Sequence, residues 1–250
     1  MAEMSNDPNS APAAEKAGII DDLIEIWTSP SAVFKRRANA GFGMMMLIMT
    51  IVIGLLFFAN RGVMQGIMDA QFDKAIAEAS SNGQPMPPEA VAAMRKWGGI
   101  AGSVGAFIGV PIGILVLGLF VWLTGKIVGA DDEFGYGKAT MISAYSFAPK
   151  VLAFIAVTVQ GLLMDTSTLT GPYQLSASVA RFMDPNGNAG MLAMLARLDV
   201  FTIWCTAIIA IGIVVVGKAP KSKLLPAAVI IFLIGSIPAF WQVLMGAMKG

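Results

Sequence analysis

The stretch GFGMMMLIMTIVIGLLFFA, residues 41–59, decides the fold. It contains no charged residue and consists almost entirely of apolar side chains and glycine. An α-helix rises about 1.5 Å per residue, so about 20 such residues cross the roughly 30 Å hydrocarbon core of a bilayer. The stretch therefore predicts a helix that spans a membrane.

Four further apolar stretches follow, and the composition agrees with them. Hydrophobic residues make up 56% of the 250-residue chain and charged residues 13%, whereas soluble domains carry about a quarter charged residues. The expected fold is an all-α, polytopic membrane helix bundle with five transmembrane helices, within a membrane domain of residues 39–250. The predicted spans lie at about 40–59, 98–123, 141–164, 200–217 and 224–248.

The chain before the first span divides into two parts. Residues 1–17 are polar and small, which predicts a disordered cytoplasmic tail. Residues 18–38 are expected to form an interfacial amphipathic helix, with Trp27 at headgroup depth and Pro30 at its end, and then a basic segment. The alternative is that this helix packs against the protein's own cytoplasmic loops.

The loops and their charges predict an orientation. Short loops alternate with long ones, and compact basic clusters at 35–37 and 218–223 lie at span ends on one side. Positive charge favours the cytoplasmic side, so we expect a cell (inner) membrane protein with its N-terminus in the cytoplasm and its C-terminus outside. The long loops are expected to carry two helical hairpins on the outer face, including a short helix over residues 173–183.

Motifs of common enzymes are missing from the sequence. There is no histidine and only one cysteine, Cys205, and no phosphate-binding loop or nucleophile elbow occurs. We therefore expect no enzyme, no metal and no cofactor. The net charge of +1 also argues against a nucleic-acid partner.

Lys150 is the most informative polar residue. It lies about nine residues inside the third predicted span, where a charge is costly and indicates function by default. In that case Lys150 attracts an anionic group, and Tyr145 and Ser146 line its path. The alternative is that the helix begins at Pro149 and the lysine reaches back to the headgroups.

Three further features have structural and functional interpretations. Gly105, Gly109 and Gly113 recur every four residues and predict a helix-packing face, within the chain, between copies or beside a gated path. Arg197 and Asp199, at the start of the fourth span, are expected to pair or to cap the helix. The acidic residues 131–133 favour a solvated loop over a cation or partner site.

A series of short motifs resembles the Yip domain family of five-span membrane proteins over about residues 18–245. The motifs, in chain order, are Trp27-Thr28-Ser29-Pro30, Tyr145-Ser146-Phe147-Ala148-Pro149 and Asp199-Val200-Phe201-Thr202-Ile203-Trp204. Eukaryotic members interact with Rab-type GTPases, but their D-L-Y-G-P motif is missing here. If the chain is bacterial, as its composition suggests, no Rab GTPase partner is expected.

These observations give two functional expectations. The first is a non-enzymatic membrane scaffold or adaptor that contacts membrane lipids and a membrane-protein partner or a second copy. The alternative is a small transporter or channel for an anionic or small polar solute, which uses Lys150 in a broken third span.

Overall fold

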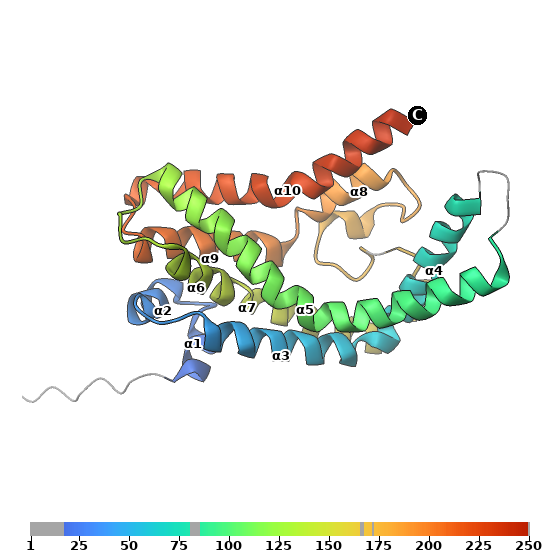
Figure 1. Ribbon diagram of the computed structural model, residues 1–250, viewed down its shortest axis with the longest axis horizontal. Helices are drawn as coiled ribbons and strands as arrows, with labels where there is room; N and C mark the ends of the chain where they lie inside the picture. Colours follow the sequence, from blue (N-terminus) through green and yellow to red (C-terminus); the bar gives the residue numbers. More distant parts are fainter. Residues whose placement is uncertain (1–17, 81–85, 166–167, 172, 250) are drawn as a thin grey trace, which may run out of the picture.

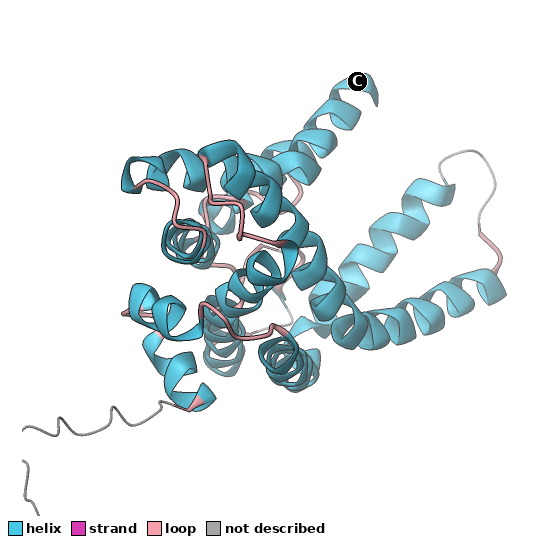
Figure 2. Ribbon diagram, turned by 60° about the vertical axis from the view of Figure 1, so that its left-hand side comes forward, coloured by secondary structure: helices cyan, strands magenta, loops and turns pink. Residues whose placement is uncertain are grey.

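The computed structural model describes residues 18–80, 86–165, 168–171 and 173–249, so the predicted tail of residues 1–17 lies outside the described residues. Figures 1 and 2 show helices joined by loops. The described ranges contain no β-strand. Ser178 and Asp199 form an isolated β-bridge. The all-α prediction is confirmed.

Ten α-helices and two short 3-10 helices occur within the described residues. The α-helices are α1 (Ile19–Glu25), α2 (Pro30–Arg37), α3 (Gly43–Ala59), α4 (Arg61–Ser80), α5 (Pro88–Val128), α6 (Tyr136–Ser146), α7 (Ala148–Leu163), α8 (Ala189–Ala196), α9 (Val200–Val216) and α10 (Leu224–Lys249). The 3-10 helices are η2 (Val179–Phe182) and η3 (Lys221–Lys223).

The long helices form one bundle around an apolar core. Helix α5 packs against α3, α6 and α10, and α9 packs against α6, α7 and α10. Their fully buried side chains include Met45, Ile114, Ile142, Ile208 and Ile213. In Figure 1 the turns after α5 and α9 lie at one end of the bundle, and the α4–α5 hairpin lies at the other.

Within the part of the chain that the structure describes, fewer than five helices have the length and apolarity of a membrane span on their own. Three do: Val104–Val128, Tyr136–Leu163 and Lys221–Met248. Helices α3 and α4 together make a fourth if the pair, bent by 74°, is one span, and α9 is a shorter apolar helix of 17 residues. Five transmembrane helices are therefore not confirmed.

Proline and glycine set two helix boundaries, and one predicted boundary, at Pro30, is wrong. Pro30 does not end the first amphipathic helix; α1 ends at Glu25, and Pro30 is the first residue of α2, where its missing N–H is tolerated. The second predicted span lies within helix α5, which runs from Pro88 to Val128 and is capped by Gly129, whose φ of 84° favours glycine.

The outer loops differ in part from the prediction. Helix α4 and the first part of α5 form one helical hairpin, as expected. The second long loop contains α8 and the four-residue η2, whereas a helix over 173–183 is not formed. The hydroxyl groups of Ser176 and Ser178 hydrogen-bond to each other at 2.7 Å, and the Ser176 hydroxyl donates to the Tyr173 carbonyl at 2.6 Å. Such side-chain hydrogen bonds compete with the backbone bonds of a regular helix.

Candidate functional site

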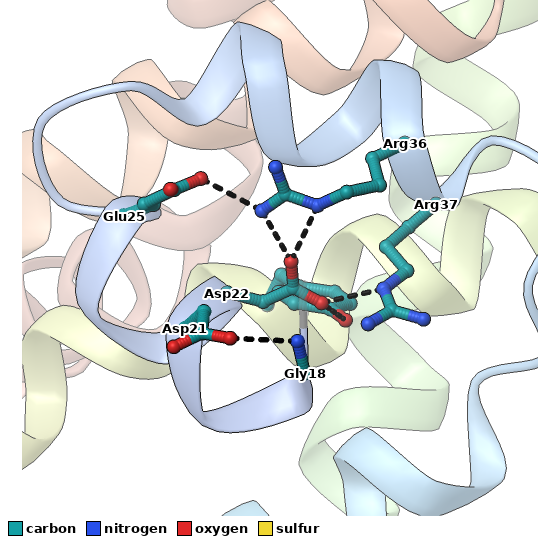
Figure 3. A network of polar contacts seen from close by, with 7 residues as sticks. Gly18, Asp21, Asp22, Glu25, Arg36 and Arg37 are labelled. Carbon is teal, nitrogen blue, oxygen red and sulfur yellow. Dashed lines mark hydrogen bonds and ion pairs between the residues drawn. The ribbon is translucent and has the colours of Figure 1, made fainter. Parts of the chain in front are cut away.

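Asp22 is the centre of a polar cluster that joins α1 to the bundle. Its carboxylate is fully buried, and Arg36 donates to Oδ1 from Nε and Nη2 at 3.0 and 2.5 Å. Arg37 donates from Nε to Oδ2, and the Tyr145 hydroxyl donates to the same oxygen at 3.2 Å. Figure 3 shows both guanidinium groups pointing at the carboxylate from α2. The Asp22 cluster, as we name it, comprises Asp22, Glu25, Arg36, Arg37 and Tyr145.

The cluster balances its own charges. Glu25 accepts a second hydrogen bond from Arg36 Nη2 at 2.7 Å, so two carboxylates face two guanidinium groups. The hydrogen bond from Arg36 to Glu25, followed by that to Asp22, raises the pKa of Arg36 above its ordinary value. A buried carboxylate is tolerated when its lone pairs are occupied by charged donors. The cluster is therefore a structural joint between α1, α2 and α6.

The opposite face of α1 is apolar and uncovered. Ile20 and Ile24, four residues apart and so on one helical face, are 70% and 62% exposed. Ile26, by contrast, is fully buried in the core. Asp22, on the acidic side of α1, turns into the protein, while these two isoleucines face outward. Trp27 is partly buried and its indole Nε1 has no described hydrogen-bond partner.

A second ionic contact joins two turns at the same end of the bundle. Lys218 lies 2.9 Å from Asp131 and 3.3 Å from Glu133, and the Asp131 backbone N–H donates to the Gly217 carbonyl at 2.9 Å. The hydrogen bond with Lys218 lowers the pKa of Asp131 and raises that of Lys218. Two of the predicted acidic loop residues thus fasten the α5–α6 turn to the α9–α10 turn.

Lys150 lies beside a break in the third apolar stretch. Tyr136–Leu163 contains 28 residues, and Lys150 is the fifteenth of them. The α-helical pattern is interrupted at Phe147, because Pro149 has no N–H to donate back to the preceding turn. The helical stretch therefore begins at Tyr136 rather than at Pro149. The Lys150 ammonium lies 4.7 Å from the centre of the Phe147 ring.

A cavity of about 340 Å³ lies in front of Lys150, between α5, α7, α9 and α10. Its charged lining residues are Lys150, Arg197 and Asp199, and Thr202, Cys205 and Thr206 add polar atoms. Apolar walls come from Leu117, Ala153, Phe154, Phe201, Ile209 and Ile231. We name this space the Lys150 cavity. It contains two cations and one carboxylate.

Arg197 reaches the cavity from a second break, between α8 and α9. Its Nε donates to the Ser236 hydroxyl at 3.2 Å, and its guanidinium lies 5.4 Å from the centre of the Phe232 ring. A Cβ on Gly235 would lie 2.6 Å from Arg197 Nη2, so glycine makes room for the guanidinium. Gly235 is the fifteenth of the 28 residues in Lys221–Met248. The Arg197 guanidinium therefore lies beside the middle of the apolar helix α10.

Asp199 has the capping role that was one of its two predicted roles. Its Oδ1 accepts hydrogen bonds from the backbone N–H groups of Phe201 and Thr202, both at 3.0 Å. It forms no ion pair with Arg197 within the described chain. The carboxylate is thus engaged by the start of α9 rather than by a cation.

The structure separates residues that the transporter hypothesis grouped. Tyr145 and Ser146 do not line the Lys150 cavity: both are buried, Tyr145 bonds to Asp22, and the Ser146 hydroxyl donates to the Ser143 carbonyl at 2.7 Å. Pro149 is also buried and acts at the break. Arg197, rather than Tyr145 and Ser146, shares the lining of this cavity with Lys150.

The predicted glycine face packs differently from expectation. Gly105 and Gly109 have no described heavy atom within 4 Å of an added Cβ, and at Gly113 the nearest is Phe147 at 3.6 Å. Gly105 and Gly109 thus have no close neighbour among the described residues, and helix packing through these two glycines stays a prediction. Close approach occurs instead at Gly118, where a Cβ would lie 3.0 Å from the Thr140 Cα, and at Gly190, where it would lie 2.6 Å from the Val243 Cα.

No group of three or more His, Cys, Asp or Glu side chains in the described ranges has the geometry to hold a metal ion. Two arrangements were missed by sequence reasoning. Asp22 is fourteen and fifteen positions from its arginines, a separation that no local periodicity links. Arg197 and Lys150 line one cavity because two helix breaks face it.

Comparison with known proteins agrees with a membrane assignment. The model of the Yip1 domain matches residues 24–242. The chain is also similar to a Bacillus subtilis (strain 168) protein described as membrane protein YknW, with 24% identity over 251 residues and coverage of 99% of each chain. No solved structure matches.

Proposed function

Because this chain belongs to the Yip1 domain family, we propose that it is a non-enzymatic scaffold or adaptor that organises partner proteins in the membrane. The proposal includes an inner-membrane location, five crossings and a cytoplasmic N-terminus. The basic clusters at 35–37 and 218–223 support this orientation, since they lie at one end of the bundle together.

The observation that carries the proposal is the α4–α5 hairpin. Helix α5 has 41 residues, but its apolar span is Val104–Val128, so Pro88–Ser103 extends beyond that span by roughly 24 Å. Figure 1 shows this hairpin standing away from the rest of the bundle. An arm of this kind presents surface to another protein.

The arm has a defined internal structure and an exposed apolar side. Arg95 pairs with Asp69 at 3.3 Å and with Asp73 on α4, and the Phe72 ring fills the space beside Gly98. Trp97 and Ile100 are 64% and 43% exposed. Aromatic side chains are enriched at the centres of protein interfaces, so this side of the arm is the surface that we assign to a partner.

Site-specific photo-crosslinking in intact cells tests the proposal. A photoreactive amino acid at position 97 is expected to trap one defined membrane protein, and the same residue at position 136, exposed at the other end of the bundle, is the control. Arg95→Glu removes the ion pairs of the arm and is expected to abolish the adduct at position 97. An identical adduct from both positions, or no adduct at position 97, would contradict the assignment.

A further inference from the structure

The two cations of the Lys150 cavity have N–H groups that donate to no acceptor of the described residues. Lys150 forms no ion pair with a carboxylate of the described residues, and its ammonium contacts only the Phe147 ring face. Arg197 uses Nε for Ser236, while its two Nη groups make no hydrogen bond to a described residue. Both cations therefore have donors available to a bound anion.

The position of the cavity makes an unfilled pair of cations costly. Lys150 and the Arg197 contact at Gly235 both lie at the midpoints of apolar helices of 28 residues. A single charge at the centre of a membrane helix costs about 2.5–3.5 kcal/mol on insertion scales.

The remaining walls define what else a ligand must carry. Leu117, Phe154 and Ile231 make the cavity largely apolar away from the cations. Its volume of about 340 Å³ lies at the lower end of ligand pockets, which hold about 300–1,000 Å³. A small hydrated anion would leave these walls without a partner, whereas an acyl chain would cover them.

We propose that the Lys150 cavity binds an anionic amphiphile, with its phosphate or carboxylate between Lys150 and Arg197 and its chain along the apolar walls. Arg197 presents two nitrogens to the head group, and Lys150 supplies a point charge. Asp199 accepts hydrogen bonds from the α9 backbone and forms no ion pair with either cation among the described residues. This site is separate from the α4–α5 arm, so an anionic amphiphile can bind here whether or not the arm binds a protein.

Three probes separate the head group from the chain. The full protein in phosphatidylcholine nanodiscs is titrated with hexadecyl phosphate, with hexadecanol and with inorganic phosphate. The thermal unfolding midpoint reports occupancy of the cavity. Hexadecyl phosphate is expected to raise the midpoint, while the other two probes have little effect.

Matched variants locate the site. Lys150→Gln is expected to weaken hexadecyl phosphate binding at least tenfold, whereas Lys221→Gln, which removes an exposed cation at the end of the bundle, leaves it unchanged. Ala153→Phe fills the apolar part without changing charge and is expected to block binding too. Equal protection by inorganic phosphate would overturn the amphiphile assignment, and equal binding by the Lys150→Gln and Lys221→Gln proteins would overturn the site.

Discussion

The Asp22 cluster and the Lys150 cavity both place cations beside carboxylates, but only the first balances them. At Asp22, two carboxylates accept from two arginines and a tyrosine, and every charge has an opposite partner. In the cavity, Asp199 is engaged by backbone and the two cations keep free donors. The first arrangement holds the protein together, whereas the second leaves room for a ligand.

The largest expected effect concerns the balanced cluster. Asp22→Asn keeps the size of the side chain but removes the charge that faces Arg36 and Arg37. Removing one partner of a buried ion pair costs about 3–5 kcal/mol, and here we expect the lower end because both arginines are partly exposed. Thermal unfolding in nanodiscs measures this loss. Glu25→Gln, at a more exposed acid of the same cluster, is the control and should cost much less.

A smaller loss of stability is expected when a larger side chain is placed against the Arg197 guanidinium. Gly235→Ala would place a Cβ 2.6 Å from Arg197 Nη2, so the guanidinium must move and its bond to Ser236 is lost, at a cost of about 1 kcal/mol. Gly246→Ala on the same helix meets no described atom within 4 Å and is the matched control. If both variants lower the unfolding midpoint equally, Arg197 is not held where the structure places it.

The smallest effect concerns the exposed contact between the two turns. The lowered pKa of Asp131 means that its contact with Lys218 persists above the ordinary aspartate value of about 4 and is lost as pH falls through the lowered pKa. The raised pKa of Lys218 means that the contact is lost only as pH rises through that raised value. Between these limits, Lys218→Gln should change the unfolding midpoint only slightly, and less at high salt. A large pH-dependent loss near neutrality would contradict this.

Sequence patterns predicted the parts of the fold that depend on local composition. Apolar runs located the long helices, and Asp199 was recognised as a possible cap, because both signals lie within a few residues. Pro30 was misread because proline is compatible with the end of one helix and with the first turn of the next. For Gly105 and Gly109, spacing shows which helical face the glycines share but not what meets that face.

The candidate sites depend on tertiary contacts that no local pattern contains. Lys150 was identified because a lysine inside an apolar run is unusual at the level of sequence. Arg197 was not identified as the second cation of the cavity, since it lines that cavity only when the α8–α9 break packs against the middle of α10. Tyr145 was assigned to the wrong site for the same reason: it is close to Lys150 in sequence, but it bonds to Asp22.

One charge-matched pair of variants tests the central contrast most directly. Arg37→Met and Lys150→Met each remove one cation, the first from the balanced cluster and the second from the unbalanced cavity. Without added ligand in phosphatidylcholine nanodiscs, Arg37→Met should lower the thermal unfolding midpoint by several degrees, because the buried Asp22 loses a donor. Lys150→Met should leave the midpoint unchanged or raise it, because it removes an unpaired charge from an apolar helix. A comparable fall in both proteins would contradict the account.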